Sequence, residues 1–380
     1  MWAGTWWREA SELDTAQQDV AALPADGKYL VTGKPGSGKT NLLVLRAAYL
    51  IRANHPNLKI LTWTRLLKEF ISSVSESHGL MDDQLQTFKS WSERALAEIG
   101  INIVVDGDYE VQINQLIAAL RSVCGSLARY DGLLVDESQD YPLAVINLFT
   151  ELAGRLFFVG DENQRIYASS GALNAIRELV DQEFVLPYHY RNGRRICLVA
   201  EGISNERDYA TTSRYDEERL PSRVYLRGFG SVERQVEATV VELRAQIRSY
   251  PGELLGVMVP HRDERNATIE LLRESEIEEY CQFQTRVEGY SGLEEDKPVV
   301  VSSVHGAKGL EYRAVHIVGL EGLGRFPAAK QRNIAYTAVT RAKTTLHGYY
   351  TGAIPSWLRS AFMRGQDPPS TPTLTDLFAR

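Results

Sequence analysis

Apolar runs of strand length alternate with amphipathic helical patterns along most of the chain. The strand candidates fall into two series, one in each half of the sequence. The first series comprises residues 28–32, 58–63, 132–135, 155–160 and 183–187, and the second comprises 223–229, 253–260, 298–303 and 314–320. The clearest helix is predicted at 231–249, where one face carries Val232, Val236, Val240, Leu243 and Ile247. This alternation is typical of an α/β protein whose parallel sheets are covered by helices on both faces.

The two series predict two α/β domains that meet near residues 187–192. The length of 380 residues agrees with this division, because domains commonly have about 150 residues. We therefore predict a first domain over 1–187 and a second over 188–363. Clusters of polar residues favour loops at 204–222 and 288–297 and a flexible tail at 364–380.

The composition is that of a globular protein with a large core, since 44% of the residues are hydrophobic and 24% are charged. No long uncharged apolar run is present, and the first residues lack a basic region followed by an apolar stretch. We expect a cytoplasmic protein with no membrane partner. The cysteines are odd in number and far apart, which favours free thiols over a disulfide framework or a zinc site at Cys124, Cys197 and Cys281.

The net charge of -7 argues mildly against a nucleic-acid partner, because phosphate backbones bind basic surfaces. A local basic groove on an acidic body is compatible with it. Basic clusters at 191–195 and 341–343 could line such a groove, and a solvated surface is the alternative for both.

Residues 33–40 fit the pattern of a phosphate-binding loop and lie between an apolar strand and an amphipathic helix. The glycines let the backbone turn its N–H groups toward phosphate oxygens, and the helix N-terminus adds positive potential. Lys39 is placed for the β- and γ-phosphates, and Thr40 is placed for Mg²⁺. The predicted nucleotide-binding residues are Gly33, Lys34, Pro35, Gly36, Ser37, Gly38, Lys39 and Thr40.

Acidic residues follow directly after two of the predicted strands. Asp136 and Glu137 end the strand at 132–135, and ligand sites of parallel sheets lie at the carboxyl ends of strands. We predict that Asp136 holds Mg²⁺ and that Glu137 polarises the attacking water as a general base. The strand at 155–160 ends at Asp161, and Gln164 just beyond could reach the γ-phosphate or the water. A solvated acidic loop is the alternative.

With these features, the order of motifs resembles the superfamily 1 helicases of the UvrD/Rep type from about residue 13 to 350. The matching stretches are LDTAQQ (13–18), LTWTR (61–65), TFKSW (87–91), VDESQD (135–140), GDENQRIY (160–167), YHYRNGRRI (188–196), SVHGAKGLEY (303–312) and AYTAVTRAK (335–343). The resemblance implies two RecA-like P-loop NTPase domains, with ATP and Mg²⁺ bound in the cleft between them.

The resemblance also implies roles for residues of the nucleotide site. Arg191 and Arg341 would reach across the cleft to the γ-phosphate as arginine fingers. Tyr190 would stack on adenine, Gln17 would read its edge, and Glu311 would bond the ribose hydroxyls. Lys308 could approach the nucleotide or the strand. For each arginine taken alone, a helix end or the surface is the alternative.

The same resemblance implies a site for a nucleic-acid strand. Trp63 and Tyr167 are candidates for stacking on bases, and a core position is the alternative for Trp63. The candidates for phosphate contacts are Thr62, Thr64, Lys89, Arg262 and His305. Closure of the cleft on ATP binding would shift the grips of the two domains relative to each other, which is a step along the strand.

The sequence departs from the family pattern in several places. Ser169 stands where the family typically carries a Trp that stacks on a base, and Asn41 stands where it often carries Arg. Only about 40 residues separate TFKSW from VDESQD (135–140), the acidic box, so the first accessory subdomain is predicted to be reduced to helices near 92–128. A short loop near 287–297 is predicted in place of the second.

We therefore expect an ATP-dependent single-stranded DNA translocase or DNA helicase of 3′–5′ polarity, acting on single-stranded DNA or a single-strand/duplex junction. Such motors serve DNA repair, replication, phage and plasmid biology and defence alike. One alternative is an RNA-directed motor. Another is an ATP-operated switch or scaffold, and Ser169 and the acidic net charge favour this second alternative. A protein partner could dock on the N-terminal segment with Trp2, Trp6 and Trp7 or on the C-terminal tail, although packing of these Trp side chains on the first domain is the simpler interpretation.

Overall fold

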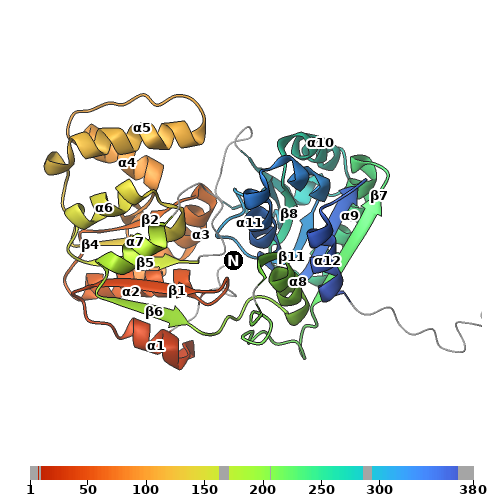
Figure 1. Ribbon diagram of the computed structural model, residues 1–380, viewed down its shortest axis with the longest axis horizontal. Coiled ribbons are helices and arrows are strands. Elements are labelled where there is room, and N and C mark those ends of the chain that lie inside the picture. The colour runs from red at the N-terminus through yellow and green to blue at the C-terminus, as the bar shows by residue number, and fades with distance from the viewer. Residues whose placement is uncertain (1–6, 8–9, 162–170, 206, 286–292, 367–380) are drawn as a thin grey trace, which may run out of the picture.

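The computed structural model describes residues 7, 10–161, 171–205, 207–285 and 293–366, so Gln164, Tyr167, Ser169 and most of the tail lie outside the described residues. The chain forms two α/β domains that lie side by side, each built on a six-stranded sheet (Figure 1). Neighbouring strands are parallel throughout both sheets. The predicted fold class is confirmed.

The first sheet has the strand order β3-β2-β4-β5-β1-β6. Its strands are β1 (Lys28–Gly33), β2 (Leu58–Thr62), β3 (Leu85–Thr87), β4 (Gly132–Val135), β5 (Leu156–Gly160) and β6 (Gln182–Leu186). Its helices are α1 (Thr15–Ala21), α2 (Lys39–Arg52), α3 (Arg65–Ser75), α4 (Phe88–Glu98), α5 (Tyr109–Ser122), α6 (Leu143–Leu152) and α7 (Ala172–Leu179). Successive strand residues such as Leu30 and Val31 belong to two separate apolar clusters, one packed on α1–α3 and one on α4–α7. Both faces are therefore buried, which explains the continuous apolar runs of the central strands.

The second sheet has the order β7-β12-β11-β8-β10-β9. Its strands are β7 (Arg223–Phe229), β8 (Leu255–Val259), β9 (Cys281–Gln284), β10 (Val299–Ser303), β11 (Tyr312–Ile317) and β12 (Ala342–Thr351). Helices α9 (Val232–Ser249) and α10 (Arg262–Arg273) cover one face, and α8 (Arg194–Ser204), α11 (Ala328–Val339) and α12 (Ser356–Gly365) cover the other. The apolar cluster under α8, α11 and α12 is continuous with that under α1–α3, so one core extends across both domains.

Short 3₁₀ helices complete the described structure. They span Ala10–Glu12, Glu76–His78, Asp82–Gln84, Cys124–Ser126, Ser138–Asp140, Glu278–Tyr280 and Leu320–Arg325. Helices α4 and α5 lie in the stretch where a reduced insertion is predicted, and the predicted boundary near 187–192 falls in the connection between β6 and α8. No described helix is long and apolar enough to cross a membrane.

The predicted strands are all present, and α9 begins and ends within one residue of the expected helix. Three further strands were missed. β3 and β9 are short and contain polar Gln residues, and β12 carries Thr, His and Gly although it lies between β7 and β11. Polar side chains of β12 have partners within the second domain, since His347 stacks on Tyr225 and on the buried His316. The polar composition of β12 is therefore the reason why this strand was not predicted.

The segment 207–215 contains one buried side chain that its polar pattern does not predict. It has no regular secondary structure, as the polar pattern predicts for 204–222, yet the Tyr209 side chain is fully buried. Its ring stacks on that of His189, with a centroid distance of 4.2 Å. The predicted loop is therefore present, and Tyr209 belongs to the interior although Arg207, Asp208 and Thr211 of the same segment are exposed.

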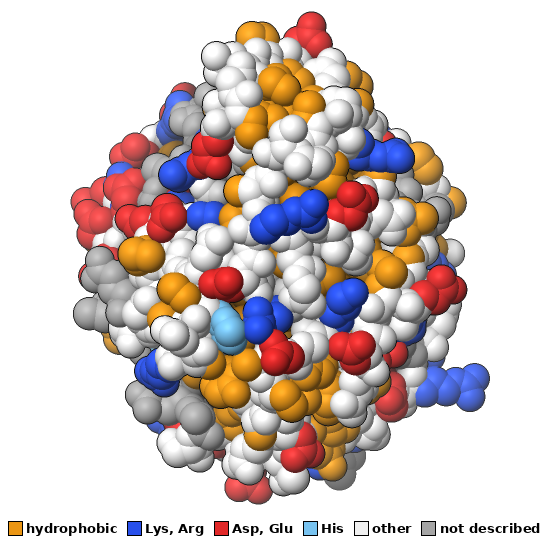
Figure 2. Space-filling view, turned by 90° about the vertical axis from the view of Figure 1, so that its left-hand side faces the viewer, with side chains coloured by type: hydrophobic (Ala, Val, Ile, Leu, Met, Phe, Trp, Pro, Cys, Tyr) orange, Lys and Arg blue, Asp and Glu red, His pale blue; other side chains and the backbone are white. Residues whose placement is uncertain are grey.

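The outer face of the first domain carries acidic and basic side chains in a mixed arrangement (Figure 2). Hydrophobic side chains gather at its upper end, the height at which Figure 1 places α5. Among the described residues of this face, charge of one sign does not dominate.

Buried imidazoles in the second domain make the fold sensitive to acid. His316 lies between Gln246 (2.8 Å) and the Tyr349 hydroxyl (3.0 Å) and stacks on His347. Burial lowers the pKa of His347 to about 3 and holds the pKa of His316 well below its usual value. Both rings are therefore neutral in the folded protein over the range in which they take up a proton when unfolded.

We expect the free energy of unfolding to fall as the pH drops from about 6.5 toward about 4. The unfolded chain binds protons at these imidazoles below their ordinary pKa, while the folded chain does not, so each contributes a slope of about 1.4 kcal/mol per pH unit. Urea denaturation as a function of pH measures the slope, and His347→Gln should make it shallower. An unchanged slope in that variant would contradict the assignment.

Candidate nucleotide site between the domains

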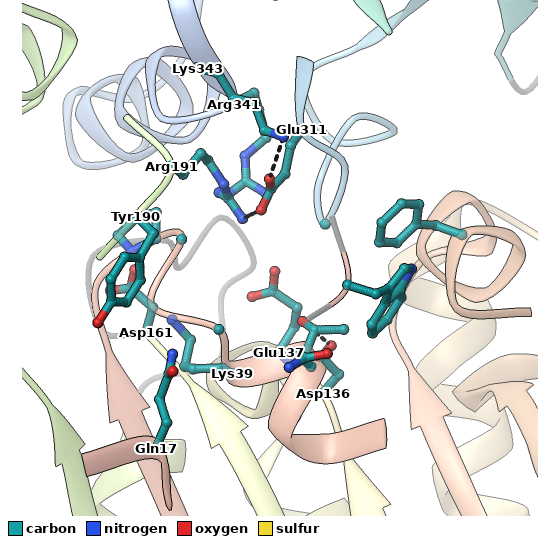
Figure 3. A pocket seen from close by; sticks show the side chains of 18 residues that line it. Gln17, Lys39, Asp136, Glu137, Asp161, Tyr190, Arg191, Glu311, Arg341 and Lys343 are labelled. Carbon is teal, nitrogen blue, oxygen red and sulfur yellow. Dashed lines mark hydrogen bonds and ion pairs between the residues drawn. The ribbon is translucent and has the colours of Figure 1, made fainter. Parts of the chain in front are cut away.

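A pocket between the two domains brings together most of the predicted site residues (Figure 3). The first domain contributes Trp7, Gln17, Pro35, Gly36, Gly38, Lys39, Thr40, Asn41, Phe70, Asp136, Glu137 and Asp161. The second contributes Tyr190, Arg191, Gly309, Glu311, Arg341 and Lys343. The first domain faces this gap with the carboxyl ends of β1, β4 and β5, whereas Glu311 and Arg341 of the second domain directly precede β11 and β12, so loops distant in the sequence converge on it.

The phosphate-binding loop connects β1 to α2. Gly36 and Gly38 have φ of 77° and 90°, conformations that side-chain-bearing residues rarely adopt. The Lys39 ammonium donates to the carbonyl oxygens of Gly33 (2.6 Å) and Lys34 (3.0 Å), which holds it over the loop. Burial lowers the pKa of Lys39, and the nearby carboxylates of the site, Asp161 first, oppose this. The loop is thus shaped to surround phosphate oxygens.

Other residues of the loop have different surroundings. The Lys34 ammonium pairs with Asp208 at 2.7 Å, and the carbonyl of Pro35 accepts from the Tyr209 hydroxyl at 3.3 Å, so both face the second domain. The Ser37 side chain is fully buried. Only part of the loop therefore points into the pocket.

The residues predicted to hold Mg²⁺ lie together. The Thr40 hydroxyl donates to Asp136 at 2.8 Å, from the first turn of α2 to the end of β4. A hydroxyl and a carboxylate, completed by nucleotide phosphates and water, are an oxygen donor set that suits Mg²⁺. Among the described residues, no group of three or more His, Cys, Asp or Glu side chains could form a metal cage. The donor set fits a metal that arrives with its nucleotide.

Glu137 differs from Asp136 in its electrostatic environment. Burial, with the neighbouring charge of Glu137, raises the pKa of Asp136 to about 6. Burial also opposes ionisation of Glu137, but the charges of Lys308, Arg341 and Lys39 outweigh it and lower the pKa. Glu137 is therefore the carboxylate held in the ionised form, which a general base requires.

A network not predicted from the sequence orients Glu137. Its backbone is left-handed, with φ of 51°, and its carboxylate accepts from the side-chain amide of Gln139. The other end of that amide accepts from the backbone N–H of Asp161 at 3.0 Å. Gln139 thus connects the acidic residues at the end of β4 with Asp161 at the end of β5. The only sign of this network in the sequence was the Gln within the VDESQD motif.

Lys308 corrects the expectation that it approaches the nucleotide or the strand. Its ammonium is fully buried, pairs with Asp140 and lies 3.4 Å from Glu137. The two carboxylates raise the pKa of this lysine even though burial opposes the charge. Lys308 therefore joins the second domain to the acidic box of the first.

The two predicted arginine fingers arrive from separate loops of the second domain. Arg191, between β6 and α8, pairs with Glu311 and donates to the carbonyl of Thr340 at 3.3 Å. Arg341, directly before β12, donates to the carbonyls of Thr337 (3.2 Å) and Leu310 (3.3 Å).

Across the pocket, both guanidinium groups face Lys39, Asp136 and Glu137 (Figure 3). Glu311 also lies 3.7 Å from Lys343. Burial opposes ionisation of Glu311, but the charges of Arg191 and Lys343 outweigh it and lower the pKa of this carboxyl. The second domain thus presents a cationic cluster to the acidic residues of the first.

Gln17 and Tyr190 lie at one end of the pocket (Figure 3). Asp14 caps α1 together with Gln17 and accepts from the Tyr190 hydroxyl. The Gln17 amide donates to the carbonyl of Ser37 at 2.9 Å, and a Cβ at Gly38 would lie 2.7 Å from the same amide. Both side chains are thereby held beside the phosphate-binding loop, as an adenine site requires.

The residues predicted to contact a nucleic-acid strand do not converge on one site as the nucleotide-binding residues do. Trp63 is buried, with its ring 4.8 Å from that of Tyr141 and 6.0 Å from that of Phe88. Thr62 is also fully buried and donates to the carbonyl of Thr64 at 3.2 Å. Stacking of Trp63 on a base is therefore wrong for this conformation, because the aromatic core of the first domain encloses its ring. A phosphate contact by Thr62 is wrong for the same conformation, because its side chain is buried.

None of the other described residues predicted to contact a nucleic-acid strand lines the pocket. The Thr64 hydroxyl donates across the domain boundary to the carbonyl of Lys308 at 3.2 Å. Lys89 is partly exposed and donates to Gln112 at 2.8 Å, whereas Arg262 is exposed at the start of α10. His305 is partly buried, which lowers its pKa to about 4. Tyr167 and Gln164 lie outside the described residues.

An aromatic pair that the sequence did not reveal also lines the pocket. Trp7 stacks on Phe70 of α3 with centroids 5.4 Å apart. Of the N-terminal tryptophans, this described one packs on the first domain, which is the simpler of the two interpretations. No periodic signal precedes it, so its position could not have been read from the local sequence.

Comparisons with known proteins agree with the motif order. Residues 298–347 match the family model of the UvrD-like helicase C-terminal domain, and residues 17–170 match that of an AAA domain. The chain is 25% identical over 243 residues to a probable DNA helicase of Mycoplasma pneumoniae, covering 56% of this chain and 42% of that protein. This chain thus spans less than half the length of that curated relative.

A solved structure of the C-terminal domain of a possible DNA helicase from a Lactobacillus strain, WCFS1, is similar at 19% identity and a TM-score of 0.33, over 44% of this chain and 91% of that one. The matched family models confirm the resemblance to UvrD-like helicases. Together with the two parallel sheets, they confirm two RecA-like domains.

We expect Lys308→Met to lower the free energy of unfolding by about 3–5 kcal/mol, because it removes the cation that neutralises the buried Asp140. The double variant Lys308→Met/Asp140→Leu should recover most of this loss, since it removes both charges. Urea denaturation of the three proteins measures the difference. Equal losses in the single and double variants would show that the ion pair does not connect the domains.

Proposed function

We propose that this chain is an ATP-dependent translocase on single-stranded DNA, or a DNA helicase, that moves 3′ to 5′ and hydrolyses ATP with Mg²⁺. One observation carries the proposal. Arg191 and Arg341 of the second domain face Lys39 and Glu137 of the first across a single pocket. Such a pocket is complete only when the domains are together, which couples nucleotide chemistry to domain movement.

Most of the residues that bind the nucleotide and activate the attacking water belong to the first domain. The loop N–H groups and Lys39 hold the phosphates, and Thr40 and Asp136 would hold Mg²⁺, which would supply positive charge beside the phosphates. Glu137 accepts a proton from the attacking water, and Gln139 and Lys308 keep its carboxylate oriented and ionised. Gln17 and Tyr190 hold the adenine.

The second domain supplies positive charge where negative charge develops. Arg191 and Arg341 stabilise the γ-phosphoryl group in the transition state, and Glu311, which pairs with Arg191, bonds the ribose. After hydrolysis the attraction between these arginines and the γ-phosphate is lost. The cleft then opens, and the cycle of closure and opening moves the domains relative to each other.

The contact between Thr64 and Lys308 would connect a bound nucleic-acid strand with the nucleotide pocket. Thr64 is proposed to contact the strand, and the turn that carries Lys308 also carries His305. Lys89 and Arg262 would add contacts to the backbone phosphates, and Tyr167 would stack on a base. A strand seated along the cleft would thus touch the turn that holds Glu137.

A second candidate function is an ATP-operated switch or scaffold that controls a protein partner. The burial of Thr62 and Trp63 favours it, because two of the predicted strand contacts are lost. A switch would close on ATP without any need for a strand. An RNA-directed motor would use the same pocket and differ only in the strand that activates it.

We expect single-stranded DNA to stimulate ATP hydrolysis at least about tenfold at low salt, with stimulation falling steeply as salt rises, because strand binding releases counterions. Steady-state hydrolysis with DNA, with RNA and without a strand measures this. Equal rates under all three conditions would favour the switch, and a larger effect of RNA would favour the RNA motor. Lys39→Ala is the inactive control.

Replacing Arg341 by Ala should lower kcat about 10³-fold while ATP affinity changes only a few fold, since an arginine finger acts mainly in the transition state. Arg359→Ala, at an exposed position on α12, is the matched control and should hydrolyse ATP normally. Thermal denaturation checks that the buried Arg341 can be removed without unfolding. A folded Arg341→Ala protein with normal turnover would show that the proposed two-domain site is wrong.

A further inference from the structure

The segment 207–215 places one buried hydroxyl between the phosphate-binding loop and the two loops that carry Arg191 and Arg341. The Tyr209 hydroxyl lies 2.5 Å from Oδ1 of Asn192 and 3.3 Å from the carbonyl oxygen of Pro35. Its ring is fixed by stacking on His189, whose Nε2 lies 2.7 Å from the Tyr209 carbonyl oxygen. The hydroxyl is therefore held in one position, and water does not compete for it because the side chain is fully buried.

Asn192 extends this contact to both arginines. It directly follows Arg191 in the chain, and its side-chain NH₂ donates to the carbonyls of Thr340 (3.0 Å) and Ala342. Those two carbonyls flank Arg341. Because both amide hydrogens are used by carbonyl acceptors, the amide oxygen is left to accept from Tyr209, which determines the orientation of the amide. One side chain thus ties together the two loops that carry the arginines.

The same segment also contacts the phosphate-binding loop directly. Lys34 pairs with Asp208 at 2.7 Å and donates to the Thr212 hydroxyl at 3.1 Å. The backbone N–H of Tyr190 donates to the carbonyl of Gly36 at 3.0 Å. The tip of the loop is therefore bonded to the second domain at several successive residues, with Tyr209 at the centre.

We propose that Tyr209 and Asn192 are positioning residues that set both arginines relative to the phosphate-binding loop. This inference rests on the proposed function, ATP hydrolysis in this pocket. An arginine acts on a transferring phosphoryl group only within hydrogen-bond reach, so a shift of a fraction of an ångström lowers the rate more than it weakens substrate binding. Neither residue needs to touch the nucleotide.

Tyr209→Phe is the informative variant, because it keeps the ring and its stack on His189 and removes only the hydroxyl. We expect kcat for DNA-stimulated hydrolysis to fall about tenfold, with KM for ATP changed less than about twofold. Tyr215→Phe is the matched control. It removes a hydroxyl from the same segment, one that lies 2.7 Å from Thr344 Oγ1, and it should leave kcat unchanged.

A second comparison separates positioning from a general loss of structure. In an Arg191→Ala background, Tyr209→Phe should lower kcat by much less than tenfold, because part of what the hydroxyl positions is already gone. Asn192→Asp, which turns a carboxylate toward two carbonyl oxygens, should lower kcat at least as much as Tyr209→Phe. A tenfold fall of the same size in both backgrounds would show that the hydroxyl does not act through Arg191 and would overturn the inference.

The assay uses the full chain, ATP with Mg²⁺ and a single-stranded DNA oligonucleotide. If the unmodified protein and Tyr215→Phe hydrolyse ATP and Tyr209→Phe has the same kcat, the positioning role is wrong while the proposed function stands. If none of the proteins hydrolyses ATP with or without a strand, the proposed function is wrong and the inference falls with it.

Discussion

The buried ion pair of Lys308 with Asp140 and Glu137 is the interaction on which the geometry of the pocket depends. Charges removed from water are tolerated only when they are paired, so the turn that carries Lys308 has to lie against the acidic box of the first domain. Thr64 fastens the same turn through its bond to the Lys308 carbonyl. A change in the relative position of the domains would disturb these contacts, and Glu137 would then respond to that position directly.

Two glycines of the pocket permit close contact between the domains. A Cβ at Gly36 would lie 2.3 Å from Cβ of Arg191, and a Cβ at Gly309 would lie 2.8 Å from the Leu67 side chain. Each of these glycines, one from each domain, also has a positive φ. Two constraints therefore act at each position, a backbone conformation and a close approach between domains, and no residue with a side chain meets both without displacement.

Local patterns predicted much of the fold because they arise from local causes. The buried strands β8 and β10 are continuous apolar runs, and α9 shows its buried face in the spacing of its valines. β12 was not predicted, because its polar side chains find partners elsewhere in the second domain, as the stacking of His347 on Tyr225 illustrates. Trp63 shows the opposite error, since a motif associated with strand binding is enclosed by Tyr141 and Phe88.

The sequence by itself determined the phosphate-binding loop, the carboxylates at the ends of β4 and β5 and the two-domain α/β architecture, because each depends on backbone conformation and periodicity within a few residues. Only the tertiary structure decided that Lys308 neutralises Asp140, 168 positions away in the chain, and that Tyr209 of a polar segment lies beside Pro35. Burial and charge pairing are properties of side chains brought together from distant segments. A lysine or tyrosine has the same local signature whether it ends in solvent or at the centre of the site.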